Sequence, residues 1–119
     1  MKRSLLFISF LASFVSFNAQ SDYYIRLMRS YQREAEYYTK QAQGYDKEVA
    51  YYNRQAQGYL REAEYYSNRK KYDQVRSYLR KAKDASDMAV SYKRKADYAM
   101  DKAKSYMQKA ENALQNAKK

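Results

Sequence analysis

The chain has 119 residues with no proline, cysteine or histidine, and its formal net charge is +11. Without cysteine there can be no disulfide bond, so packing alone must stabilise the fold. The chain also lacks the commonest general base, metal ligand and thiol nucleophile of proteins, so we expect no enzyme and no cofactor.

Residues 1–19 have the pattern of a cleaved secretory signal peptide. Lys2 and Arg3 precede an uncharged, mostly apolar run from Leu5 to Phe17, as in the basic and hydrophobic regions of such peptides. The run is shorter than the about 20 residues that span a bilayer as a helix. We expect cleavage after Ala19, with Ser21 as an alternative site, and export to the periplasm or the cell exterior. A short anchor that stays attached is the other interpretation, and no later segment has the composition of a transmembrane span.

A seven-residue repeat predicts a first helix over residues 22–67. Tyrosine recurs at every seventh position, and small or apolar residues follow four positions later (Tyr24, Tyr31, Tyr38, Tyr45, Tyr52, Tyr59, Tyr66; Met28, Ala35, Ala42, Val49, Ala56, Ala63). Steps of four and three place both rows on one helix face, at the d and a positions of a coiled coil.

The repeat is interrupted within SNRKKYD, residues 67–73. The tyrosine row would continue at Asp73, but a second row begins at Tyr78, so we predict a turn over residues 68–72. A second helix follows over residues 73–117, with its own d and a rows (Tyr78, Ala85, Tyr92, Ala99, Tyr106, Ala113; Val75, Ala82, Ala89, Ala96, Ala103, Ala110, Ala117).

These two seams predict an all-α fold, a long antiparallel two-helix coiled-coil hairpin over residues 20–119. If paired residue numbers sum to 141, most layers join one tyrosine ring to a small or β-branched residue, and no tyrosine faces another. Each ring then covers the partner's alanine and keeps its hydroxyl in water. We interpret the seam tyrosines as structural, with a ladder for stacking a ligand as the alternative. The same register predicts four ion pairs between the helices (Glu34–Lys109, Glu48–Lys95, Glu62–Lys81, Asp46–Lys93).

An outer row on the first helix alternates large and small residues. The row contains Tyr23, Ser30, Tyr37, Gly44, Tyr51, Gly58 and Tyr65. We predict that Tyr23, Tyr37, Tyr51 and Tyr65 form an interaction stripe that interlocks with another hairpin. Exposed rings without a partner are the alternative. The small core of a single hairpin also favours a protein partner or a homo-oligomer.

Positive charge gathers in the second half of the chain. Residues 20–66 have seven basic and seven acidic residues, whereas residues 67–119 have fifteen basic and six acidic, a net of +9. We predict an anion-binding tip at the turn, formed by Arg69, Lys70, Lys71, Arg76 and Arg80. Its expected partner is an anionic envelope polymer or the phosphates of lipopolysaccharide. Nucleic acid, bound by charge and stacking, is less favoured, and a solvated surface is the alternative.

Three parts of the sequence resemble known families. Residues 63–86, AEYYSNRKKYDQVRSYLRKAKDAS, resemble the turn of a tetratricopeptide repeat, which implies a helix–turn–helix. Both predicted helices run beyond one repeat, and no second repeat follows. The signal peptide, basic chain and hairpin are similar to the Skp/OmpH periplasmic chaperones, a likeness that implies unfolded outer-membrane proteins as clients. The alanine seam and terminal Lys119 resemble the murein lipoprotein, without its lipid-bearing cysteine.

Together these patterns predict a non-enzymatic, exported helical hairpin that binds a protein or assembles with itself. One alternative is a small periplasmic chaperone-like binder of unfolded or anionic clients. The other is a binder of nucleic acid or envelope polymer through the basic second helix. Self-assembly predicts oligomers without a client, a chaperone suppresses aggregation, and a polymer binder loses affinity steeply with salt.

Overall fold

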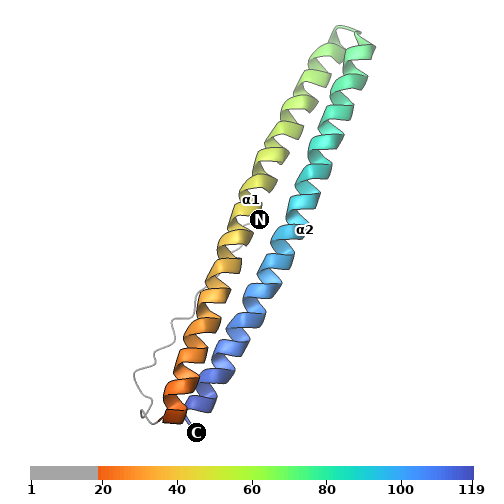
Figure 1. Ribbon diagram of the computed structural model, residues 1–119. Helices are drawn as coiled ribbons and strands as arrows, with labels where there is room; N and C mark the ends of the chain where they lie inside the picture. Colours follow the sequence, from red (N-terminus) through yellow and green to blue (C-terminus); the bar gives the residue numbers. More distant parts are fainter. Residues whose placement is uncertain (1–18) are drawn as a thin grey trace. The chain divides into compact units, whose positions relative to one another are not determined.

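The computed structural model describes residues 19–119, which form two long helices packed together (Figure 1). Helix α1 runs over Ala19–Asn68 and helix α2 over Tyr72–Ala117. The predicted signal peptide lies outside the described residues apart from Ala19, where α1 begins. None of the described helices is long and apolar enough to cross a membrane.

The composition of both helices explains their length. They contain no proline, only two glycines, and many alanine, lysine, arginine, glutamine and glutamate residues, which have high helix propensity. An acidic residue lies in the first turn of each helix, Asp22 in α1 and Asp73 in α2. A carboxylate there interacts favourably with the positive end of the helix dipole.

The chain forms two compact units, each containing a segment of α1 packed antiparallel against a segment of α2. The described part of unit 1 is residues 19–43 together with Tyr98–Lys119, and unit 2 is Gly44–Asp97, which includes the turn. Unit 1 has an apolar cluster of Ile25, Met28, Ala110, Ala113, Leu114 and Ala117. Ser21 Oγ donates a hydrogen bond of 3.0 Å to the Ala117 carbonyl oxygen, which ties the start of α1 to the end of α2.

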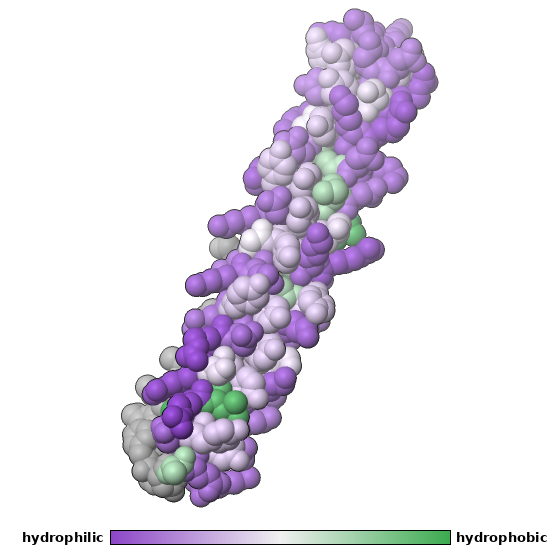
Figure 2. All heavy atoms as spheres, in the orientation of Figure 1, coloured by the Kyte–Doolittle hydropathy of each residue, from purple (hydrophilic) through white to green (hydrophobic). Residues whose placement is uncertain are grey.

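The seam of unit 2 consists of buried alanines beneath half-buried tyrosine rings. Its buried alanines are Ala56, Ala63, Ala82, Ala85, Ala89 and Ala96, and its half-buried tyrosines are Tyr45, Tyr52, Tyr59, Tyr66, Tyr78 and Tyr92. Small residues let two backbones approach closely, and each ring covers the space while its hydroxyl end stays near water. The face drawn in Figure 2 is mostly hydrophilic, with small hydrophobic patches between the polar side chains.

Each α2 tyrosine of the seam lies between two tyrosines of α1. In unit 2, Tyr92 stacks on Tyr52 with ring centroids 5.7 Å apart and packs at a tilt against Tyr45 at 6.0 Å. Tyr78 does the same between Tyr66 and Tyr59, and in unit 1 Tyr106 lies between Tyr38 and Tyr31. Tyr92 is therefore level with Val49, which agrees with pairs that sum to 141.

The expectation that no tyrosine would face another is wrong. Rings do not meet within a layer, but rings of neighbouring layers stack across the seam with interplanar angles of 8°, 11° and 10°. The physical reason is the size difference within each layer. An alanine or valine leaves room above it, so the opposite ring leans along the helix axis and contacts the next ring, which adds about 0.5–1.5 kcal/mol per aromatic pair.

Candidate functional site

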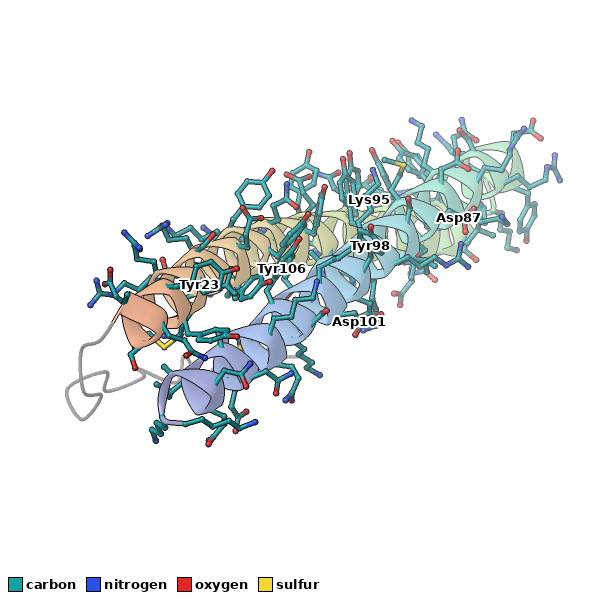
Figure 3. The ribbon with its side chains drawn as sticks, turned by 60° about the horizontal axis from the view of Figure 1, so that its bottom comes forward. Tyr23, Asp87, Lys95, Tyr98, Asp101 and Tyr106 are labelled. Carbon is teal, nitrogen blue, oxygen red and sulfur yellow. The ribbon has the colours of Figure 1, made fainter. Side chains whose placement is uncertain are left out.

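The predicted interaction stripe lies on the surface, and its rings have defined orientations. Each outer tyrosine packs edge-on against the seam tyrosine that follows it in sequence, with centroids 5.1–5.2 Å apart and interplanar angles of 73–82°. The outer rings are between 43% and 56% exposed. Tyr23 and Tyr37 belong to unit 1, and Tyr51 and Tyr65 belong to unit 2. Figure 3 labels Tyr23 on α1 and Tyr106 where the two helices meet.

Nothing within the described chain requires the two glycines of this outer row. A methyl group at Gly44 or Gly58 would have no neighbouring atom within 4 Å, and neither residue has a positive φ. Each glycine in a helix interior costs about 1 kcal/mol relative to alanine. The glycines therefore lower the stability of unit 2 and leave open space at its surface, in the same row as the exposed rings of Tyr51 and Tyr65.

The Gly58→Ala variant should raise the free energy of unfolding by about 0.5–1 kcal/mol, because the added methyl meets open space and lowers the entropy of the unfolded chain. Urea denaturation at a low protein concentration measures this. The neighbouring exposed Gln57, changed to alanine, is the control and should alter stability by less than about 0.5 kcal/mol. A loss of stability in Gly58→Ala would show that the position is crowded.

A shallow hollow of about 290 Å³ opens beside the same row, next to the layer in which the register pairs Ala56 with Ala85. It is lined by Tyr51, Tyr52, Gln55, Tyr59, Lys81, Asp84, Ala85 and Met88. Partial burial raises the pKa of the Tyr52 hydroxyl, and Tyr92, Glu48 and Tyr51 add to the shift. The Tyr52 hydroxyl can donate a hydrogen bond, and the lining combines tyrosine, alanine and methionine with Gln55, Lys81 and Asp84.

Three of the four predicted ion pairs between the helices, those of Glu34, Glu48 and Glu62, are not formed. Among residues 19–119, Glu34, Glu48 and Glu62 make no ion pair. Four ion pairs elsewhere each join two residues of the same helix (Arg26–Asp22, Arg76–Asp73, Lys83–Asp87, Lys93–Asp97). The lysine that was expected to pair with each of these glutamates instead has its Nζ 4.9 Å from the ring centroid of the tyrosine three residues before it (Lys81 on Tyr78, Lys95 on Tyr92, Lys109 on Tyr106). A cation over a ring at an exposed site gains about 0.5–1 kcal/mol, more than the few tenths expected from an exposed ion pair.

The turn between the helices has the hydrogen bonds of a Schellman motif. The Lys71 amide donates to the Tyr66 carbonyl at 3.0 Å, and the Lys70 amide donates to the Ser67 carbonyl at 3.0 Å. Lys70 has a φ of 58°, at the position where glycine is usual. A side chain in this left-handed conformation costs about 1–2 kcal/mol. The turn therefore keeps a lysine where a glycine would be less strained.

The predicted anion-binding tip falls at this turn and on the first three turns of α2. The Arg69 guanidinium lies 3.7 Å from the centroid of the Tyr65 ring. Arg69 of the tip therefore contacts Tyr65 of the interaction stripe. Arg76 is paired with Asp73. Within the described chain, Arg69, Lys70 and Lys71 form no ion pair.

Sequence reasoning missed two members of this surface, Leu79 and Lys83. They line an open hollow with Arg76 and Arg80. Leu79 follows Arg76 by three residues and Lys83 follows Arg80 by three residues, and this spacing is the signal that would have placed them on the same helix face. Lys83 also bonds Asp87 at 2.9 Å, and this bond and the carboxylate charge raise its pKa, so it stays positively charged.

The described residues contain no group of three or more acidic side chains placed to hold a metal ion. No protein-family model matches the sequence, and comparisons with curated proteins and with solved structures find no match. The resemblances noted from the sequence thus remain likenesses of a short segment and of composition. The candidate site is a pair of surfaces on unit 2, the stripe with its hollow and the basic tip.

Proposed function

We propose that the protein is an exported, non-enzymatic helical hairpin that assembles with a second copy of itself through one face of unit 2. This assembly face is formed by Glu48, Tyr51, Gly58, Glu62 and Tyr65 of α1 with Ser77, Lys81, Asp84, Met88, Ser91 and Lys95 of α2. The observation that carries the proposal is the open space at Gly58 between two exposed, oriented rings. Export is supported by the basic and apolar pattern of residues 1–19.

The two helices contribute complementary sizes to the assembly face. In the register of the ring stacks, Tyr51 is level with Ser91, Gly58 with Asp84, and Tyr65 with Ser77. A two-fold axis along the helices would place α1 of one copy against α2 of the other. Each outer ring then meets a serine of the second copy, and the space at Gly58 receives the larger Asp84. Met88, which is exposed, would reach the hollow beside Gln55.

The charges on this face are complementary under the same two-fold axis. Glu48 and Glu62 form no ion pair within the described chain, and Lys95 and Lys81 stand over tyrosine rings. A second copy would bring its Lys95 opposite Glu48 and its Lys81 opposite Glu62. Such pairs select orientation and partner more than they add affinity. One hairpin also buries little core, so association would add the apolar burial that it lacks.

The Gly58→Leu variant should weaken self-association at least about tenfold, since the leucine side chain fills the space that Asp84 of the second copy would occupy. The monomer should stay folded, because the position is open within one chain. Sedimentation equilibrium over a range of protein concentrations measures the dimer constant. The control is Gln57→Leu, which adds the same side chain one position away and should leave that constant unchanged. A wild-type protein that stays monomeric, or a Gly58→Leu variant that associates normally, contradicts the proposal.

Charge reversal tests the orientation of the two copies. Glu48→Lys and Lys95→Glu should each weaken association, by about fivefold, and the double variant should restore it, because the reversed pair is again of opposite sign. Additive weakening in the double variant would rule out this pairing. If the wild type stays monomeric but prevents aggregation of unfolded proteins, the chaperone-like function is favoured instead.

A further inference from the structure

Positive charge is concentrated at the turn end of unit 2. Residues 69–83 contain seven basic residues and one acidic residue, Asp73, and that carboxylate is paired with Arg76. Arg69 is held in place by the Tyr65 ring and by a hydrogen bond of 3.4 Å from its guanidinium to the Tyr65 carbonyl oxygen. We infer that this end of the protein docks onto a lipid surface that carries phosphate headgroups.

The conformation of Lys70 is the first observation that favours a charge-binding role. Its backbone has the left-handed conformation that a glycine adopts without strain. A residue kept in a strained conformation points to a role other than stability. Here the residue in that conformation is a cation, and it stands in the sequence between two further cations, Arg69 and Lys71.

Exposed apolar side chains among these cations decide between a lipid surface and a soluble polyanion. Leu60 is 50% exposed, Leu79 is 47% exposed and Tyr72 is 57% exposed. Leu79 lines a hollow with Arg76, Arg80 and Lys83, so an apolar side chain lies within a basic rim. Cations bind headgroup phosphates, while leucine and tyrosine gain by entering the boundary between headgroups and acyl chains. A soluble polyanion offers nothing to the leucines.

Vesicle co-sedimentation of the full chain tests this inference. The protein should bind mixed phosphatidylglycerol/phosphatidylcholine vesicles and not vesicles of phosphatidylcholine alone. Lys70→Gly should weaken that binding about fivefold, since each Lys or Arg near an anionic surface contributes about 1 kcal/mol. The same variant should raise the midpoint of thermal unfolding by about 4 °C, because the strain at Lys70 is relieved. If Lys70 had only a structural role, Lys70→Gly would raise the midpoint of thermal unfolding without weakening vesicle binding.

Two further comparisons separate the possible ligands. Lys70→Gln should weaken vesicle binding, whereas Lys104→Gln, which removes the same charge from an exposed position of unit 1, should not. Leu79→Ser should weaken vesicle binding about fivefold while leaving any binding of inorganic polyphosphate unchanged. The inference is overturned if Lys70→Gly binds vesicles like the wild type. It is also overturned if Leu79→Ser has no effect and polyphosphate displaces the protein fully, a result that would identify a soluble polyanion as the ligand.

Discussion

Changing Tyr92 to alanine should lower the free energy of unfolding by about 3 kcal/mol. Tyr92 stacks on Tyr52, packs at a tilt against Tyr45 and carries the Lys95 ammonium over its ring. One truncation therefore removes two aromatic contacts and a cation–π contact, and it leaves a gap opposite Val49. Urea denaturation followed by circular dichroism measures the loss.

Two controls identify the source of that loss. Tyr98 is 63% exposed, and its only ring contact in the described chain is with Lys102 at 5.6 Å. Tyr98→Ala should therefore cost less than about 1 kcal/mol. Tyr92→Phe keeps the ring and should cost much less than the alanine variant. Equal losses for Tyr92→Ala and Tyr98→Ala would mean that the seam tyrosines are not structural.

Enlarging Ala96 to leucine should lower the free energy of unfolding by about 2 kcal/mol. Ala96 is 0% exposed, and the seam register places it opposite Tyr45. The two helices approach closely because the residue between the ring and the α2 backbone is small. A leucine at this position must push the ring aside or move the helices apart, and either change disturbs the tilted packing of Tyr45 against Tyr92.

Ala50→Leu is the matched control for this enlargement, since Ala50 is an exposed alanine of α1 in the same unit. Its stability should change by less than about 0.5 kcal/mol, because alanine and leucine have similar helix propensity and the side chain meets water. If both leucine variants have the stability of the wild type, the seam tolerates larger residues, and close approach of the helices is not what the alanines provide.

The seam was predictable from the sequence, because helix periodicity and residue size are local properties. A tyrosine every seventh residue with small residues four positions later places one stripe on each helix. Only an antiparallel pairing with sums of 141 then puts Tyr92 level with Val49. The outer row could be placed for the same reason, since the positions of Tyr51 and Tyr65 follow from spacing alone. Their edge-on packing against Tyr52 and Tyr66 did not follow from spacing.

The contacts of the charged side chains were decided by the tertiary structure. Opposite charges across the register predicted Glu48 with Lys95, but Lys95 lies over Tyr92. The ring is three residues away on the same helix, so the lysine reaches it without ordering a second long side chain across the seam. Arg69 in the same way contacts Tyr65, four residues before it. The spacing in the sequence allows Lys95 to contact either Glu48 or Tyr92. The position of the Tyr92 ring decides which contact forms.

Taken by itself, the sequence determined two helices, their turn and the residues that share each face, because these depend on spacing of three, four and seven. The tertiary structure alone decided that rings stack between layers, that Lys70 takes a left-handed conformation in place of glycine, and that space stays open at Gly58. Each of these depends on the distance between atoms of different turns or different helices. For the ring stacks, that distance is set by how closely the alanine layers allow the backbones to approach.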